Sequence, residues 1–276
     1  MPTTQAVILA RGLGTRMRRA EPAPAPLSRG QSAAADAGAK GMMPVGGDAG
    51  RPFLEYVLSA LADAAIREVV VIVAPDHAAI REHFTQAAPP QRTTVRFAVQ
   101  DQPLGTADAV YAARDAVRAA PFLVLNADNY YTPAALRAAA ALETDGLVAF
   151  NADALVRLSA IEPERILRYA LLDIAPGDTL RAIREKPGPD DPLASAPERW
   201  VSMNLWSFTP AIFEACRRVV PSPRGELELQ DAVTVAMRDL GATFRVARVR
   251  EGVLDLSRRG DVAVVSERLA GVTVWP

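Results

Sequence analysis

Short apolar runs rich in β-branched residues alternate with segments of helical periodicity through the first half of the chain. The run Glu-Val-Val-Val-Ile-Val-Ala at 68–74 is apolar on both faces, which is typical of a strand inside a parallel sheet. Asp76 stands where a helix N-cap is expected. Four such alternations predict a parallel sheet covered by helices on both faces. The predicted strands are 6–9, 68–74, 95–99, 122–125 and 146–150, and the predicted helices are 53–65, 76–86, 106–117 and 133–142.

The edge of this sheet at which the strands end is the place to expect a ligand. Open α/β sheets bind ligands outside the carboxyl ends of their strands. The residues that follow Leu9, Val99 and Leu125 are therefore expected to line one crevice.

The second half of the chain has a less regular pattern. Segments 166–174 and 180–183 predict a hairpin turned by Pro176-Gly177-Asp178. Strands are predicted at 200–208 and 242–249, and helices at 210–219 and 229–240. No linker divides the chain, so we expect a single folding unit over 1–276. Segment 19–39 is dominated by Ala, Pro, Ser and Gly, which predicts a flexible loop.

Composition narrows the class of protein. Half of the 276 residues are hydrophobic, and 31 Lys+Arg balance 32 Asp+Glu, which argues against a nucleic-acid or membrane-surface binder. The single cysteine, Cys216, excludes an internal disulfide and is expected in the core. Two histidines leave little material for a histidine-based metal site. No apolar run reaches the length of a membrane span and the start lacks a basic leader region, so we expect a cytoplasmic protein.

The basic residues are strongly skewed toward arginine. Of the 31, only two are lysines, Lys40 and Lys186. Where lysine persists in such a background, the site is expected to need a compact ammonium that a planar guanidinium cannot imitate. Both lysines are therefore candidates for a functional role.

The first predicted strand runs directly into Leu9-Ala10-Arg11-Gly12-Leu13-Gly14-Thr15-Arg16-Met17. Glycines here let backbone N–H groups converge on an anion, and Arg16 can fork onto its oxygens. Met17 stands where the third glycine of a dinucleotide-binding fingerprint would fall, so that class of site is excluded. The segment predicts a phosphate-binding loop, with a purely structural tight turn as the alternative.

Seven segments, in order along the chain, resemble the signature motifs of the sugar-1-phosphate nucleotidyltransferases, the glucose-1-phosphate thymidylyl- and uridylyltransferase group. Each segment alone is a weak signal, but seven in family order are a strong one. They are 9–17, Lys-Gly-Met-Met-Pro-Val at 40–45, Gln-Asp-Gln-Pro-Leu-Gly-Thr-Ala at 100–107, Asn-Ala-Asp-Asn at 126–129, Glu-Lys-Pro at 185–187, Arg-Gly-Glu-Leu-Glu-Leu-Gln-Asp at 224–231, and Val-Leu-Asp at 253–255.

The resemblance implies an α/β fold of the glycosyltransferase-A-like kind, a Rossmann-like, mostly parallel sheet with helices on both faces and a small β-rich sugar-binding part. Residues 1–150 would form the nucleotide-binding half and 151–276 the sugar-phosphate-binding half. It also implies Mg²⁺-dependent transfer of a nucleotidyl group from an NTP to a sugar-1-phosphate. The expected NTP is UTP or dTTP. The partners are then these two substrates, without nucleic acid or membrane, and a homo-oligomer is left open.

Two alternatives to this activity remain open. One is an enzyme that uses GTP or ATP and acts on a mannose-, heptose- or cyclitol-phosphate. The other belongs to a different class, an inactive sensor that binds a sugar nucleotide without turnover.

The chemistry of this family suits the residues of the chain. The attacking sugar-phosphate oxygen is already ionised at neutral pH, so no general base is required, in agreement with the scarcity of histidine. Catalysis then depends on positioning two anions and neutralising charge on the transferring phosphorus. The resemblance assigns Arg16 to the triphosphate, Lys40 to the α-phosphate and leaving group, and Lys186 to the sugar phosphate. Asp128 and Asp255 are the implied Mg²⁺ ligands.

The remaining site residues implied by the resemblance fall into two groups. Gln100 would pair with a pyrimidine edge, and Glu185 and Glu226 would accept hydrogen bonds from sugar hydroxyls. The nucleotide group is Leu9, Ala10, Gly12, Gly14, Thr15, Gln100, Gly105 and Thr106, and the sugar-phosphate group is Tyr169, Ala170, Glu185, Lys186, Asn204 and Glu226.

Several positions depart from the family pattern or allow another interpretation. Gly41 replaces a proline, Val253 a tryptophan and Ala170 a glycine, and Ser202-Met203-Asn204 replaces the usual pattern there. Retention of nucleotidyl transfer is therefore expected more firmly than glucose specificity. Asp255 is also explicable as the N-cap of a helix over 258–270. Asp153 ends a second Asn-Ala-Asp sequence, at 151–153, and is either an alternative metal ligand or a residue that only resembles one. The connection from Arg16 to Lys40 is longer than the family loop, and we expect segment 19–39 to be a flap that closes over the triphosphate and delivers Lys40.

Overall fold

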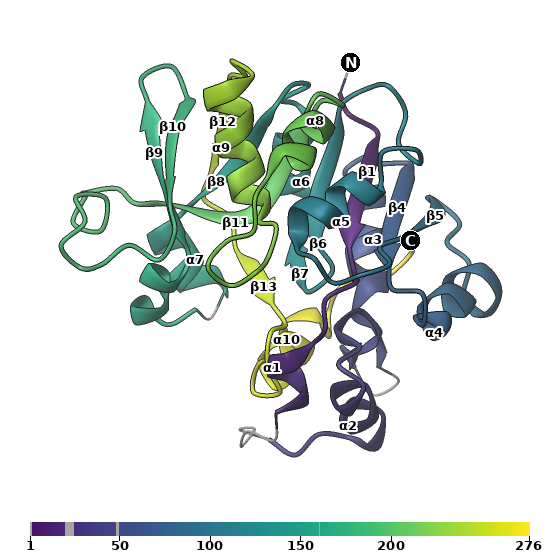
Figure 1. Cartoon of the computed structure of the whole chain (residues 1–276). Helices are drawn as coiled ribbons and strands as arrows, with labels where there is room; N and C mark the ends of the chain where they lie inside the picture. Colours follow the sequence, from purple (N-terminus) through teal and green to yellow (C-terminus); the bar gives the residue numbers. More distant parts are fainter. Residues whose placement is uncertain (1, 20–24, 48–49, 160) are drawn as a thin grey trace.

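The computed structural model describes residues 2–19, 25–47, 50–159 and 161–276. Its centre is a sheet of nine strands with helices on both sides (Figure 1). The strands follow one another across the sheet in the order β5, β4, β1, β6, β11, β8, β12, β10, β9. Their bounds are β5 Thr94–Val99, β4 Glu68–Val73, β1 Gln5–Leu9, β6 Phe122–Asn126, β11 Trp200–Phe208, β8 Gly146–Asn151, β12 Arg245–Val249, β10 Thr179–Arg184 and β9 Ala170–Ala175.

The expected sheet is confirmed, including its mostly parallel half. Strands β5, β4, β1 and β6 are mutually parallel, and β12 is parallel to β8. Strand β11 runs antiparallel between β6 and β8, and β9 and β10 form the predicted antiparallel hairpin. In Figure 1 this hairpin extends away from the parallel half, at the left of the view.

Successive residues of the central strands enter opposite cores, as a pleated strand requires. Ile8 of β1 belongs to one buried cluster and Val7 to the other. The first cluster includes helices α3 (Phe53–Asp63) and α6 (Pro133–Ala140). The second includes α5 (Thr106–Ala112), α8 (Ile212–Arg218) and α9 (Leu229–Asp239). Helices therefore cover both faces, and the apolar runs read in the sequence are buried for this reason.

Several predicted helices begin or end elsewhere in the structure. Asp76 is not a cap, because α4 (Ala78–Glu82) has His77 at its N-cap position and continues as a π-helical turn, η2 (His83–Ala87). Helix α5 stops at Ala112 rather than 117. Among the described residues, no helix is long and apolar enough to cross a membrane.

Several shorter elements lie outside the nine-stranded sheet. The pairs β2–β3 and β7–β13 form two small antiparallel ladders. Elements η1 and η3 are short 3₁₀ helices. These elements are β2 Pro44–Val45, β3 Arg51–Pro52, β7 Asn129–Tyr131, β13 Val253–Asp255, α1 Thr15–Arg18, η1 Lys40–Met42, α7 Ala152–Ser159, η3 Pro163–Arg168 and α10 Asp261–Leu269.

The prediction of a loop over 19–39 is wrong for its second part. Residues Arg29–Asp36 form helix α2. The helix begins with a capping box, in which Ser28 Oγ accepts from the Gln31 N–H and Gln31 Oε1 accepts from the Ser28 N–H, satisfying two donors that a helix start leaves unpaired. Of the predicted loop, residues 20–24 lie outside the described residues.

Two large aromatic side chains, Trp206 and Tyr131, belong to the core. The Trp206 side chain is fully buried and stacks on Phe208. Tyr131 is 1% exposed, and its hydroxyl donates to the Met203 carbonyl.

Cys216 is buried within α8, as the sequence analysis expects for a core side chain. Burial raises the pKa of its thiol to about 12, so the reactive thiolate is scarce at neutral or mildly alkaline pH. We expect the native protein to resist iodoacetamide or a disulfide reagent at pH 8, whereas the unfolded protein should react within minutes. Stoichiometric thiol labelling of the native protein at that pH would contradict this assignment.

Candidate active site

The segments that follow β1, β5 and β6 meet at one edge of the sheet. The Ala10 N–H donates to the Ile72 carbonyl at 3.0 Å, and the Ala127 N–H donates to the Leu9 carbonyl at 3.1 Å. Arg11 Nε donates to the Gln100 carbonyl at 3.4 Å. The parallel strands thus bring the first, third and fourth motifs together at their carboxyl ends, as expected.

Asp128 and Asp255 are neighbours although they are far apart in the sequence. Strand β13 pairs antiparallel with β7, so that Asp255 stands opposite Asn129, the residue after Asp128. The ladder is extended by the Leu256 N–H, which donates to the Asp128 carbonyl at 2.8 Å. This two-strand ladder holds both carboxylates at the carboxyl end of β6.

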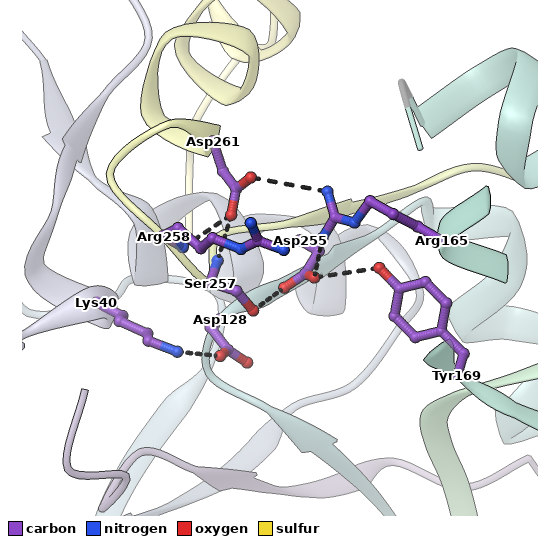
Figure 2. A network of polar contacts seen from close by, with 8 residues as sticks. All are labelled: Lys40, Asp128, Arg165, Tyr169, Asp255, Ser257, Arg258 and Asp261. Atoms are coloured by element: carbon purple, nitrogen blue, oxygen red, sulfur yellow. Dashed lines mark hydrogen bonds and ion pairs between the residues drawn. The ribbon is translucent and has the colours of Figure 1, made fainter. Parts of the chain in front are cut away.

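Lys40 faces the same carboxylates. Its Nζ lies 2.8 Å from Asp128 Oδ2, and the two side chains are 20% and 23% exposed. Figure 2 shows Lys40 approaching Asp128 from one side, while Asp255 lies on the other. One cation and two carboxylates from three distant motifs therefore form one cluster.

The carboxyl group of Asp255 is enclosed by polar side chains. Ser257 Oγ donates to its Oδ1 at 2.6 Å, and the Tyr169 hydroxyl donates to its Oδ2 at 3.4 Å. Arg165 Nη2 lies 3.7 Å from the same Oδ2. Burial and the nearby Asp128 carboxylate raise the pKa of Asp255 to about 6, because both disfavour its charged form. Figure 2 shows these side chains converging on the acid.

The alternative role of Asp255 as a helix N-cap is wrong. The residue lies in β13, and α10 begins six residues later at Asp261. The Asp261 carboxylate instead accepts from the backbone N–H groups of Ser257 and Arg258, at 2.9 and 2.8 Å. Asp255 is thereby left to face Asp128.

The donor set of this cluster suits a hard divalent cation. Mg²⁺ prefers oxygen ligands and commonly takes one or two carboxylates, with phosphate oxygens and water completing its shell. Asp128 and Asp255 supply two such carboxylates at the carboxyl end of β6. The other candidate, Asp153, is unsuitable, since its side chain is 78% exposed and its nearest cation is Arg199 at 3.8 Å.

The connection before Lys40 is packed tightly against the phosphate-binding loop. Gly14 and Gly38 both have positive φ values, of 62° and 68°. A Cβ on Gly14 would lie 2.4 Å from the Gly38 carbonyl oxygen, and one on Gly38 would lie 2.6 Å from Arg18 Nε. Only glycine permits this backbone-to-backbone approach. The loop before Lys40 is therefore held next to the first motif.

Arg259 joins three segments of the site. Its Nε donates to the carbonyls of Met17 and Arg19 at 3.0 and 3.1 Å, and its Nη2 lies 2.5 Å from Asp36 Oδ1 in α2. The arginine follows β13 closely, so it ties the strand of Asp255 to α1 and to the helix that precedes Lys40. Its side chain is only 14% exposed.

We expect Arg259→Met to lower the free energy of unfolding by about 1–3 kcal/mol, because several carbonyl and carboxylate acceptors lose a shared, largely buried donor. Equilibrium denaturation with urea measures the change. The matched control is Arg268→Met, an exposed arginine on α10, for which a change within about 0.5 kcal/mol is expected. Equal stability of the two variants would show that Arg259 does not hold these segments together.

The Gln100 motif docks on the segment 224–231. The Leu227 N–H donates to the Leu104 carbonyl at 2.7 Å, and the Ala107 N–H donates to the Leu227 carbonyl at 2.8 Å. Thr106 Oγ1 accepts from the Leu229 N–H at 2.9 Å. Gly105 is required at this contact, since a Cβ on it would lie 2.4 Å from the Leu227 carbonyl oxygen. Two motifs separated by more than a hundred residues thus form one wall.

The predicted sugar-side residues are more dispersed. Tyr169 contacts Asp255, and burial raises its pKa to about 12. Asn204 accepts from Gln230 Nε2 at 3.2 Å. Ala170 is buried in β9, where it pairs with Ser202. The remaining sugar-side candidates, Glu185, Lys186 and Glu226, are exposed.

Charge nevertheless links Glu185 to the segment 224–231. Although the residue as a whole is exposed, surrounding protein atoms desolvate its carboxyl group and so raise its pKa; Lys186 opposes this shift, while Glu228 adds to it. On the phosphate side, Gly12, Thr15 and Arg16 are exposed at the start of α1, whereas Gly14 is buried.

Sequence reasoning missed four polar residues of the site. Ser257, Asp261 and Arg259 follow the Val-Leu-Asp motif closely, and their position next to a candidate ligand was a usable signal. Arg165 lies in η3, which no motif marks. Its Nη2 lies 3.7 Å from Asp255 Oδ2, and its Nη1 lies 3.9 Å from Asp261 Oδ1. Both contacts arise from tertiary packing alone.

Comparison with known families decides how this site is classified. A model described as nucleotidyl transferase matches residues 5–251, which includes all but the last of the seven motifs. The chain belongs to the nucleotidyl transferase family. The family resemblance that the motifs indicated is thereby confirmed. This chain is an enzyme of the nucleotidyltransferase class.

Curated relatives of this nucleotidyltransferase carry related names. It is 27% identical over 265 residues to the UTP–glucose-1-phosphate uridylyltransferase AglF of Haloferax volcanii, with 96% of each chain covered. It is 28% identical over 235 residues to a glucose-1-phosphate thymidylyltransferase of Streptomyces griseus, where the match covers 83% of this chain and 56% of the relative. Several relatives are thus about twice as long as the part matched, including the low-salt glycan biosynthesis nucleotidyltransferase Agl11 of Haloferax volcanii, of which 57% is covered.

Solved structures confirm the fold of this nucleotidyltransferase. A UDP-glucose pyrophosphorylase complexed with UDP-glucose superposes with a TM-score of 0.72 at 16% identity, covering 96% of this chain and 98% of the other. A UTP-bound UGPase from Acinetobacter baumannii gives 0.73 at 19% identity, covering 99% and 95%. At these identities the likeness extends to the architecture.

Proposed function

We propose that this nucleotidyltransferase transfers a nucleotidyl group from UTP or dTTP to a sugar-1-phosphate. The products are an NDP-sugar and pyrophosphate, and the reaction depends on Mg²⁺. The observation that carries the proposal is the convergence of Lys40, Asp128 and Asp255 at the carboxyl end of β6. The relatives named as glucose-1-phosphate uridylyl- and thymidylyltransferases support the choice of substrates.

The reaction needs charge control more than proton transfer. An oxygen of the sugar phosphate attacks the α-phosphorus of the NTP, the bond from that phosphorus to the bridging oxygen breaks, and pyrophosphate leaves with the electron pair. The nucleophile is ionised at neutral pH, so no side chain has to remove a proton. Two anions must instead be brought together and the charge on the transferring group stabilised.

Lys40 is suited to stabilising this charge. Its ammonium is held by Asp128 at 2.8 Å in a partly buried setting, where a fixed cation interacts more strongly than in water. We assign Lys40 to the α-phosphate and leaving group, and Asp128 and Asp255 to the metal ion. When bound there, Mg²⁺ would neutralise charge on the phosphate oxygens.

The two substrates are assigned to opposite sides of this cluster. On the nucleotide side, Arg16 and the backbone of 12–15 would bind the triphosphate, with Leu9 and Ala10 lining the crevice and the wall of Gln100, Gly105 and Thr106 near the base. On the sugar side, Lys186 would bind the phosphate. Sugar contacts are assigned to Tyr169, Ala170, Glu185, Asn204 and Glu226.

A pyrophosphate-release assay tests the function. Purified protein is incubated with each common NTP, a panel of sugar-1-phosphates and Mg²⁺, and with EDTA as the control. We expect turnover with UTP or dTTP that EDTA abolishes. Turnover only with GTP or ATP, or only with a cyclitol or heptose phosphate, would replace the proposed substrates. No turnover with any pair, together with binding of a sugar nucleotide, would make the protein a sensor.

A further inference from the structure

The side chain of Arg165 is largely buried, yet it makes no hydrogen bond within the described part of the chain. It is 19% exposed, and its guanidinium lies 3.7 Å from Asp255 Oδ2 and 3.9 Å from Asp261 Oδ1. Both distances are too long for a hydrogen bond. The nitrogens are also absent from the unpartnered side-chain atoms that are fully enclosed. The guanidinium therefore keeps five N–H donors that can be reached from outside.

The two carboxylates beside Arg165 obtain their hydrogen bonds from other groups. Asp255 accepts from the Ser257 hydroxyl on one oxygen and from the Tyr169 hydroxyl on the other. Asp261 accepts from two backbone N–H groups. The carboxylates thus attract the guanidinium by charge and leave its donors without acceptors. A cation that is largely removed from water is costly unless a ligand or water supplies such acceptors.

The hairpin of β9 and β10 brings Arg165 to the same end of the fold as Lys186. Arg165 belongs to η3, which leads directly into the start of β9. Because β10 runs antiparallel to β9, with Arg184 opposite Leu171, the end of β10 lies beside the start of β9. Lys186 follows two residues after Arg184. The free donors of Arg165 therefore belong to the side of the site assigned to the sugar phosphate.

The cluster carries one cation on either side of its two carboxylates. Figure 2 shows Lys40 and Arg165 on opposite sides of Asp128 and Asp255. Lys40 is paired with Asp128 at 2.8 Å, whereas Arg165 stands off from Asp255. A transfer between two anionic substrates needs positive charge for each of them, in positions that align the reacting atoms. Since Lys40 is assigned to the α-phosphate, the cation on the other side is available for the second anion.

We propose that Arg165 binds the phosphate of the sugar-1-phosphate and orients it for attack. This rests on the proposed function, since it requires a phosphorylated sugar as the second substrate. A planar guanidinium can donate two parallel hydrogen bonds to two oxygens of one phosphate, which fixes the orientation of the group. Lys186 supplies a compact charge without such a fork. The third phosphate oxygen is left free to act as the nucleophile.

The test compares the two substrates in Arg165→Gln. We expect its KM for the sugar-1-phosphate to rise by about tenfold or more, because charge-assisted hydrogen bonds to the phosphate are lost. Its KM for UTP should stay close to that of wild type. The assay uses glucose-1-phosphate, or the sugar-1-phosphate that wild type prefers. A role confined to holding Asp255 and Asp261 would instead change the KM values of both substrates alike.

A second variant and a binding measurement make the test independent of folding and of turnover. Arg165→Lys keeps the charge that faces Asp255 and Asp261 but loses the planar fork, so its KM for the sugar-1-phosphate should still rise by about threefold or more. Calorimetric titration of glucose-1-phosphate onto enzyme saturated with Mg²⁺ and α,β-methylene-UTP should show the same losses of affinity in both variants.

The matched control is Arg168→Gln, which changes an exposed arginine of the same 3₁₀ helix and should leave both KM values at the wild-type level. Unchanged binding of glucose-1-phosphate in a folded Arg165→Gln, or an equal rise in its KM for UTP, would overturn the inference. Absence of turnover by wild type with every substrate pair would overturn the proposed function. Calorimetry would then still decide whether Arg165 binds the phosphate.

Discussion

Asp128→Asn is expected to lower kcat for nucleotidyl transfer by about a hundredfold or more. The substitution keeps the size of the side chain but removes a negative oxygen that faces both the metal position and Lys40. A neutral amide is a weaker Mg²⁺ ligand, and its NH₂ group would be placed against the cation. The loss falls on charge stabilisation during the reaction, for which single preorganised groups contribute on this scale.

The measurement is steady-state pyrophosphate release over a range of Mg²⁺ concentrations. Asp128→Asn should also require more Mg²⁺ for its half-maximal rate. Asp153→Asn is the matched control, because Asp153 ends a second Asn-Ala-Asp sequence but is 78% exposed, and it should retain wild-type kcat. A rate near that of wild type in Asp128→Asn would remove this residue from the mechanism.

Lys40→Arg is expected to cost about a hundredfold or more in kcat even though it preserves the charge. The Lys40 ammonium reaches Asp128 on a slim stem through partly buried surroundings. A guanidinium is larger and planar, and it would fork onto a carboxylate instead of presenting a compact charge to a phosphate. The loss of rate again reflects a misplaced charge-stabilising group.

Single-turnover and steady-state rates of the Lys40→Arg variant separate the chemical step from substrate binding, and we expect the chemical step to be slowed. Arg29→Lys is the matched control, an exchange of the same two residue types at an exposed position in the helix before Lys40. It should behave as wild type. Full activity of Lys40→Arg would mean that any cation suffices at position 40.

Much of the sheet could be predicted from local pattern. Buried strands such as 68–74 carry their signal in consecutive residues, and β11 has the predicted bounds of 200–208. The antiparallel insertion of β11 between β6 and β8 had no such signal, because strand order depends on packing between distant segments. Helix α2 was missed because low-complexity sequence hid a capping box whose two members are Ser28 and Gln31.

The candidate site was predictable as a list of residues but not as an arrangement. Motif resemblance supplied Lys40, Asp128 and Asp255. It did not supply the Arg259 contacts, the Arg165 approach to Asp255, or the bond from Gln100 to Asp108. Each of these joins segments or orients groups through side-chain contacts, for which the surrounding sequence holds no periodic signal.

The sequence by itself determined the class of the sheet, the family and the kinds of charged group available for catalysis, because periodicity and short motifs are local properties of a chain. Only the tertiary structure decided that β7 and β13 pair, that Lys40 is ion-paired with Asp128, and that the Gln100 amide nitrogen faces Gly105 and Asp108. The reason is physical: the charge state, burial and orientation of a side chain depend on neighbours that folding brings from elsewhere in the chain.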